Sequence, residues 1–170
     1  MTKAGSGNDL RILVCGAGSA AAVAGVVEAA VARGWSVDIT ATANALTMID
    51  APALTRISGR PIRTTYGYAA DGTRVSPVAD ALLAVPATFN TINKLALGIA
   101  DTYPLSSVAE VIGRGVPVVV VPAVNAALAA RAPYRRAVAS LRDEGVLFAG
   151  DGFEALDLLE GVRRMENAGS

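Results

Sequence analysis

ALLAVPATFNT, residues 81–91, passes from an apolar run to a polar turn without any intervening linker. The run Ala81 to Val85 has the length and the residue types of a buried strand. Two threonines, two asparagines and one lysine then follow within nine positions of Pro86. Since open α/β sheets bind ligands beyond the carboxyl ends of their strands, this polar turn is a candidate ligand loop.

Apolar runs of the same kind alternate with helical patterns along the rest of the chain. Strands are expected at residues 11–15, 35–40, 81–85, 116–121 and 146–149. Helices are expected at residues 19–33, 43–50, 90–99, 105–114, 132–144 and 153–165, with Gly34 capping the first and Pro52 ending the second. Residues 55–79 are expected to be irregular, with room for one short strand. Strands separated by helices imply parallel pairing with right-handed crossovers, which is an α/β fold.

The length and composition set limits on the domain and its partners. The 170 residues fit a single domain over 1–170, with residues 1–9 expected as a flexible N-terminal arm and 166–170 as a flexible tail. Hydrophobic residues make up 52% of the chain and aromatic residues only 5%, so Ala, Val, Leu and Ile must form the core. Fifteen basic residues balance fifteen acidic ones, which argues against nucleic acid as the main partner.

Several classes of chemistry are excluded by what the sequence lacks. It contains no histidine and one cysteine, Cys15, so it has no histidine base, no Cys/His metal site and no internal disulfide. No apolar run is long enough for a membrane span, and the first residues do not resemble a signal peptide. The chain is therefore expected to be cytoplasmic and to bind no membrane.

Three further loops at expected strand ends carry polar or glycine-rich sequence: GAGSAAA (16–22), TATAN (40–44) and PAVNAAL (122–128). The glycines of the first would let the backbone approach a phosphate, although a tight turn with a helix cap has the same sequence. Ala21 stands where a dinucleotide fingerprint has its third glycine, and no acidic residue closes the second strand. Both departures argue against NAD.

The loops 86–91 and 122–128 share a pattern. Each opens with Pro-Ala and reaches an asparagine, Asn90 or Asn125, three or four residues after the proline. An amide offers both a donor and an acceptor, so the two asparagines could bind a planar ring bearing carbonyl and N–H groups. Ordinary turn chemistry is the alternative for each of them taken alone.

These two loops resemble the motifs of a known family. PATFNT is similar to the PASANT motif of the homo-oligomeric flavin-containing cysteine decarboxylases, and PAVNAAL is similar to their PxMNxxM motif. The resemblance covers roughly residues 10–148. It implies a three-layer Rossmann-like or flavodoxin-like parallel sheet with helices on both faces, and bound FMN. It also implies a homotrimer or a larger assembly, such as a dodecamer, acting on a small-molecule or peptide substrate.

The resemblance also assigns individual residues. It implies that the FMN phosphate meets Gly16, Gly18, Ser19 and Thr42, and that the flavin ring is lined by Pro86, Ala87, Thr88, Asn90 and Thr91. It implies a catalytic role for Asn125, which matches the asparagine that meets the substrate carboxylate in the decarboxylases. Tyr66, Tyr68 and Arg74 fall in the irregular segment that would cover such a site, or are surface residues.

The catalytic half of the family pattern is missing. The family has a histidine shortly before the PASANT strand, and here the corresponding window, DGTRVSPVAD (71–80), has none. Asp71 or a tyrosine could replace that base only with a shifted pKa. Two functions stay open: an FMN-dependent redox or decarboxylase-like enzyme on a small carboxylate or thiol, and a non-catalytic FMN-binding partner or regulatory subunit. Prenyl transfer to flavin has no clear support.

Overall fold

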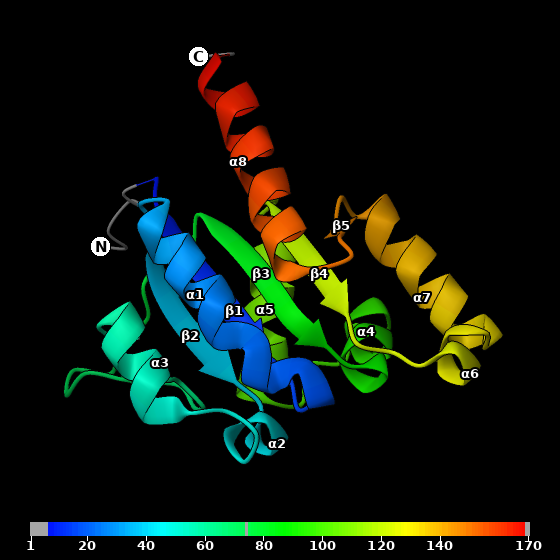
Figure 1. The fold of residues 1–170 in the computed structure, drawn as a ribbon, viewed down its shortest axis with the longest axis horizontal. Helices are drawn as coiled ribbons and strands as arrows, with labels where there is room; N and C mark the ends of the chain where they lie inside the picture. Colours follow the sequence, from blue (N-terminus) through cyan, green and yellow to red (C-terminus); the bar gives the residue numbers. More distant parts are fainter. Residues whose placement is uncertain (1–6, 74, 169–170) are drawn as a thin grey trace.

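Five parallel strands form the centre of the protein (Figure 1). In this computed structural model, which describes residues 7–73 and 75–168, the strands are β1 (Asp9–Val14), β2 (Ser36–Ala41), β3 (Ala81–Ala87), β4 (Val118–Pro122) and β5 (Leu147–Phe148). Their order in the sheet is β2-β1-β3-β4-β5, and every neighbouring pair is parallel. This is the flavodoxin-like strand order, so the expected fold class is confirmed.

Helices cover both faces of the sheet. One face packs against α1 (Val23–Ala32), α3 (Ala51–Ser58) and α8 (Gly152–Ala168), and the other against α4 (Phe89–Ala96), α5 (Tyr103–Gly113) and α7 (Ala132–Asp143). Three short helices, η1 (Gly18–Ala22), α2 (Ala43–Leu46) and α6 (Ala126–Ala129), follow the strands β1, β2 and β4. Over the described residues 7–73 and 75–168, none of these helices is both long and apolar enough to cross a bilayer.

Residue alternation along the strands explains the three layers. In β1, Ile12 and Val14 join the core under α1 and α8, while Leu13 joins the core under α5 and α7. All seven residues of β3 are buried, because this central strand is covered on both faces. Few aromatic side chains, among them Trp35 and Tyr134, join the core, so most of its stability comes from aliphatic side chains. Each of these stabilises the fold by about 1.5–3 kcal/mol when fully buried.

Some helix boundaries differ from those expected. Pro52 begins α3 instead of ending the preceding helix, because a proline in the first turn of a helix has no N–H to leave unbonded. The Asp50 carboxylate caps the same turn by accepting from the Ala53 N–H at 3.0 Å. The helix expected at 19–33 is divided into η1 and α1, and α6 was not expected at all. Residues 1–6 and 169–170 lie outside the described part of the chain, whereas β1 already starts at Asp9 and α8 continues to Ala168.

An irregular segment, residues 59–80, connects α3 to β3. It contacts α5 through Tyr66 and the buried Asp38 of β2 through Arg63. Asp38 of β2 is only 3% exposed and is paired with two arginines, Arg11 at 3.6 Å and Arg63 at 3.0 Å. Arg11 also donates to the Pro77 carbonyl at 2.8 Å, and Arg63 to the Val75 carbonyl at 2.8 Å. The buried carboxylate therefore ties the irregular segment to the sheet through two guanidinium groups.

The short strand expected within 55–79 is reduced to one bridge, between Arg63 and Thr40. Tyr66 is anchored on α5, where its hydroxyl bonds to Ser106 and its ring lies edge-on to Tyr103 at 4.6 Å. Tyr68 is 63% exposed, and Arg74 lies outside the described residues. Tyr66 is thus part of the packing of this segment, while Tyr68 is a surface residue.

Two glycines of α8 offer a matched test of the packing between α8 and α1. A Cβ added at Gly152 would lie 2.5 Å from a Val26 methyl group, whereas one at Gly161 would meet nothing within 4 Å. We expect Gly152→Ala to lower the free energy of unfolding by about 1–3 kcal/mol through overpacking. Gly161→Ala should raise it by about 0.5–1 kcal/mol, because alanine restricts the unfolded chain and favours the helix. Urea unfolding measures both, and equal effects would contradict the described packing.

Candidate functional site

Four loops leave the carboxyl ends of β1 to β4 and meet at one edge of the sheet. We call these residues, 15–22, 42–47, 86–91 and 122–128, the carboxyl rim. Backbone hydrogen bonds join neighbouring loops: the Cys15 N–H donates to the Pro86 carbonyl at 3.0 Å, and the Thr42 N–H to the Val14 carbonyl at 3.0 Å. The Ala123 N–H likewise donates to the Ala87 carbonyl at 2.8 Å. The sequence-predicted site residues are therefore brought together along a single edge.

The strand order places a topological switch point in the middle of this rim. The chain winds from β1 to β2 on one side and then returns to pair β3 on the other side of β1. The loops after β1 and β3 consequently diverge toward opposite faces of the sheet. In doubly wound sheets, ligands bind at this switch point.

The loop after β1 is closely packed at Gly16 and leaves two backbone N–H groups without an acceptor among the described residues. Gly16 packs so closely on the next loop that a Cβ would lie 2.5 Å from the Asn44 Cβ and 3.0 Å from its carbonyl carbon. Gly18 and Ser19 are exposed at the start of η1, which has no side-chain cap and no acidic residue in its first turn. Among the described residues, their N–H groups have no backbone acceptor, so they are free to donate to an anion.

The loop after β2 supplies a cap and one free amide. The Thr42 hydroxyl accepts from the Ala45 N–H at 3.3 Å and so caps α2. Its hydroxyl hydrogen is still available for a ligand. Asn44 is exposed beside Gly16 and was not among the predicted site residues. It follows a strand, as Asn90 and Asn125 do, and this shared position could have indicated it as a site residue.

The turn after β3 forms a hydrogen-bonded chain that leads down to Cys15. Thr88 caps α4: its hydroxyl accepts from the Thr91 N–H at 3.2 Å and donates to the Thr91 hydroxyl at 3.0 Å. The Thr91 hydroxyl in turn lies 3.4 Å from the Cys15 sulfur. Pro86 and Ala87 are buried in β3, and Asn90 is exposed at the rim. Of the residues predicted to line a flavin ring, Thr88 and Asn90 are thus the ones with accessible side chains.

Cys15 lies below the rim as a buried, neutral thiol. It is 1% exposed, and burial raises its pKa, with hydrogen bonds from Thr91 and from the Thr88 backbone lowering it in part. A thiol with a raised pKa stays protonated near neutral pH and is a poor nucleophile. Cys15 is therefore a core residue, in the cluster that packs under α4 and α5.

Asn125 presents a donor at the end of β4. Its side-chain oxygen accepts from the Leu128 N–H at 2.9 Å and caps α6. Its NH₂ group has no partner among the described residues, and the side chain is exposed. Because the cap engages the amide oxygen, the NH₂ group is the part of the Asn125 side chain left to donate to a ligand.

The described residues supply no evident replacement for the missing histidine base. The Thr73 N–H donates to Asp71 at 2.9 Å and lowers the pKa of this fully exposed carboxyl, which makes it a weaker base. Burial raises the pKa of Tyr134, whose ring stacks on Phe89 at 5.7 Å. Both pKa values thus move away from neutrality, so neither group is suited to proton abstraction near pH 7.

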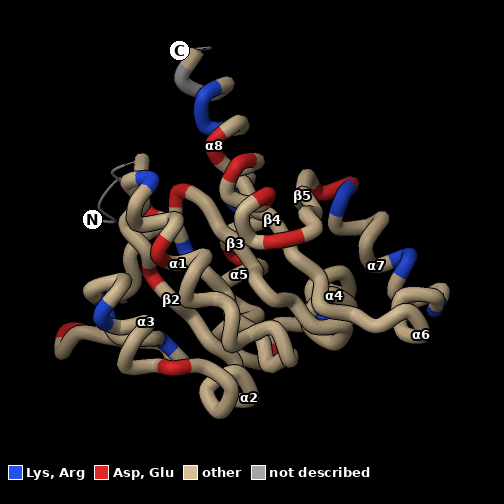
Figure 2. The backbone as a smooth tube through the Cα atoms, viewed as in Figure 1, with Lys and Arg blue, Asp and Glu red and all other residues tan. Residues whose placement is uncertain are grey.

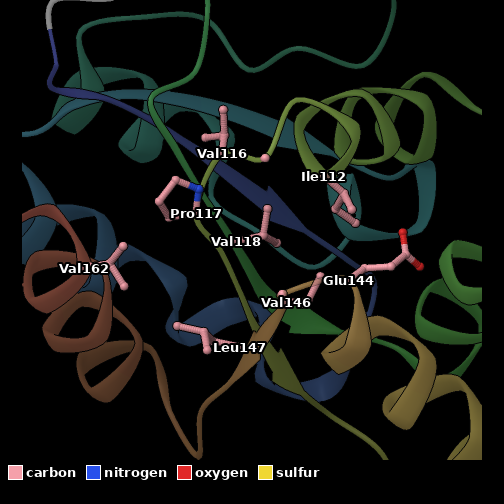
Figure 3. Close-up of a pocket in the computed structure, with 10 residues that line it drawn as sticks. Ile112, Val116, Pro117, Val118, Glu144, Val146, Leu147 and Val162 are labelled. Carbon is pink, nitrogen blue, oxygen red and sulfur yellow. The ribbon is translucent and has the colours of Figure 1, made fainter. Parts of the chain in front are cut away.

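A separate cavity of about 260 Å³ lies at the opposite edge of the sheet, near the start of β4 (Figure 3). The figure shows apolar side chains around it, with Glu144 as the one labelled acidic residue. It contains none of the motif residues and lies at the amino ends of the strands. The arrangement of the fold therefore favours the carboxyl rim, and not this cavity, as the functional site.

Comparison with known proteins identifies relatives of the whole chain. The family model described as "Flavoprotein" matches residues 2–165. The FMN-dependent cysteine decarboxylase SpaF is 28% identical, with a TM-score of 0.71, and the match covers 86% of each chain. TvaF, an FMN-dependent cysteine decarboxylase from thioviridamide biosynthesis, has a TM-score of 0.77 at 21% identity, over 92% of this chain and 98% of that one. At that identity the likeness to TvaF shows the fold alone.

A shorter match links the chain to a reductase. Over 56 residues it is 41% identical to a dihydromethanopterin reductase (acceptor) from Methanosarcina mazei. The match covers 32% of this chain and 23% of the reductase, so the chain corresponds to about a quarter of that protein.

The close contact at Gly16 can be tested against Gly18 in the same loop. The added methyl group of Gly16→Ala would overlap Asn44, so we expect a loss of about 1–3 kcal/mol in the free energy of unfolding of the flavin-free protein. A Cβ at Gly18 would meet nothing within 4 Å, and Gly18→Ala should change that free energy by less than about 0.5 kcal/mol. Thermal unfolding of the two apoproteins makes the comparison, and a larger loss for Gly18→Ala would be inconsistent with the loop packing.

Proposed function

The chain belongs to the Flavoprotein family, and from its rim residues we propose that it is an FMN-dependent redox enzyme that works without a histidine base. FMN is the cofactor that the family and the FMN-dependent neighbours indicate. The observation that carries the redox assignment is the absence of any histidine from the sequence, together with the lowered pKa of Asp71. Electron transfer by a bound flavin requires no protein base, whereas proton abstraction from cysteine does.

The rim residues fit FMN in two parts. The free N–H groups of Gly18 and Ser19 would bind the phosphate, with the Thr42 hydroxyl beside them. Thr88 and Asn90 would contact the isoalloxazine ring at the switch point between β1 and β3. Pro86, Ala87 and Thr91 would support that wall from within the sheet and α4.

Asn125 is the residue that we assign to the substrate. Its amide oxygen caps α6, which leaves its NH₂ group free among the described residues to donate to a ligand. That donor suits a carboxylate or a carbonyl oxygen of the substrate equally. The match to a dihydromethanopterin reductase supports a redox role, although it spans only about a quarter of that protein.

A non-catalytic role as an FMN-binding partner or regulatory subunit is the second candidate. The uncharged rim favours it, because the four loops contain no group that could act as an acid or a base near neutral pH. The two candidates differ in whether a small molecule binds at Asn125 and exchanges electrons with the flavin.

We also propose that the protein is a homo-oligomer of at least three chains. Leu46 and Met48, at and after α2, are 39% and 42% exposed beside the rim. A second copy covering this apolar surface would shield the flavin from solvent and would couple assembly to cofactor binding.

The proposed division of the rim is tested by flavin retention. The purified protein should release a yellow compound that co-elutes with FMN on denaturation. We expect Thr88→Val and Asn90→Ala to lower the flavin absorbance per chain, because both remove polar contacts to the ring. Asn125→Ser should retain flavin as the parent protein does, since serine still caps α6 and the phosphate is bound elsewhere.

Two results would contradict this proposal. A colourless protein that takes up no added FMN would exclude the cofactor. Loss of flavin from Asn125→Ser equal to that from Asn90→Ala would make Asn125 a flavin contact instead of a substrate contact. Release of carbon dioxide from a cysteine-ended peptide under anaerobic conditions would show decarboxylation despite the missing histidine.

Light scattering of the flavin-loaded protein tests the assembly. The expected mass is at least three times the 17.2 kDa of the chain. Met48→Glu should shift the distribution toward smaller species by placing a charge in the apolar contact, while Met165→Glu, at a residue 76% exposed on α8, serves as the control. A stable monomer that carries FMN would overturn the proposal.

A further inference from the structure

The carboxyl rim and the strand ends that lead directly into it contain no charged side chain. Residues 12–27, 39–49, 81–93 and 115–130 contain no Asp, Glu, Lys, Arg or His. Figure 2 shows the charged residues gathered on the helices and at the other edge of the sheet, with the loops at the ends of β2 and β3 almost uncoloured. Cys15, the one ionisable side chain in these ranges, is buried with a raised pKa.

Most charged residues that border these ranges are already paired. Lys94 is bonded to Asp101 at 2.7 Å, and the Asp50 carboxylate caps α3. In the segment 59–80, Arg63 is committed to Asp38 at 3.0 Å and Arg60 lies 3.7 Å from Asp9. Arg131 is exposed beyond α6, just before α7. The rim loops themselves thus bring no cation to a ligand.

The polar groups that the rim offers are neutral donors. Asn125 has its oxygen engaged with Leu128 and its NH₂ group free among the described residues. A neutral donor of fixed orientation is matched by an acceptor oxygen on the ligand. A carboxylate and a ring carbonyl both provide such an oxygen. The choice between these two ligand groups therefore depends on the electrostatic environment of the site.

Charge disfavours a carboxylate in this setting. Bound FMN adds a phosphate of up to about two negative charges at neutral pH, which the rim binds through N–H and hydroxyl groups without a balancing cation. A ligand carboxylate would be desolvated beside that charge and paired only with amides. An uncharged carbonyl compound would use the same hydrogen bond without the electrostatic cost.

Resting on the FMN site proposed above, we propose that the carboxyl rim binds an uncharged ring compound through a carbonyl oxygen that accepts from Asn125, and that it discriminates against carboxylates. This names the substrate class of the redox enzyme as a neutral cyclic carbonyl compound. It departs from the carboxylate that the family resemblance assigns to Asn125.

Benzamide and benzoate are matched probes, since they differ mainly in charge. Each is titrated into the FMN-loaded protein at pH 7, and binding is followed by the change in the visible flavin spectrum. We expect saturable binding of benzamide at least tenfold tighter than that of benzoate. The benzamide dissociation constant should be unchanged between 50 and 500 mM NaCl, because no charged pair is formed.

Two substitutions assign the effect to Asn125. Asn125→Ala should weaken benzamide binding by roughly threefold to tenfold, as expected for one lost hydrogen bond. Asn8→Ala, the same change at the opposite edge of the sheet, should leave it unaltered. Asn125→Ser preserves a cap for α6, and weakened benzamide binding in this variant would show that the lost donor, and not a disturbed helix, is responsible.

Each other outcome overturns the inference. Tighter binding of benzoate would mean that a cation from outside these loops serves the site. Absence of saturable binding by either probe, or equal loss in Asn125→Ala and Asn8→Ala, would remove the assigned contact. If the parent protein takes up no FMN, the proposed function itself fails, and this is seen before any probe is added.

Discussion

Parallel pairing of β1 with both β2 and β3 is the constraint on which the rest of the structure depends. A central strand with partners on both sides must be buried on both faces, and helices must therefore cover the sheet twice. It also forces the chain to reverse its winding direction between β2 and β3, which places the switch point at the carboxyl rim. The hydrogen bond from the Cys15 N–H to the Pro86 carbonyl, 3.0 Å long, then joins the loops that follow β1 and β3.

The buried Asp38 has an organising role of a different kind. A carboxylate that is 3% exposed is unfavourable unless it is paired, and Arg11 and Arg63 both pair with it. Each arginine also donates to one carbonyl of the segment 59–80, and Arg11 donates in addition to the Ser107 hydroxyl on α5 at 2.7 Å. One charged group inside the sheet thus positions an otherwise irregular segment beside α5.

The rim combines a flavin-binding architecture with an uncharged surface. Its capping residues Thr42, Thr88 and Asn125 hold the short helices and α4 at fixed orientations, so each cap leaves a defined set of free polar groups. In the site that we propose, FMN would be held by backbone N–H groups and neutral side chains. The redox chemistry would then be supplied by the flavin, with the rim residues serving to bind and orient it.

The sequence by itself determined the α/β class, the five strands and the positions of the four rim loops, because apolar runs and the breaks after them are local features. The order of PATFNT and PAVNAAL was also enough to indicate a flavoprotein, which the family match confirms. It did not reveal α6 or the role of Pro52, since Asn125 and Asp50 cap helices too short or too polar to have a clear pattern. Only the tertiary structure decided that Gly16 packs against Asn44, that Thr91 reaches Cys15, and that Asn125 keeps its donor free. The first two contacts join loops that follow different strands, and the third depends on the orientation of one side-chain amide. The local pattern of apolar and polar residues contains no information on either.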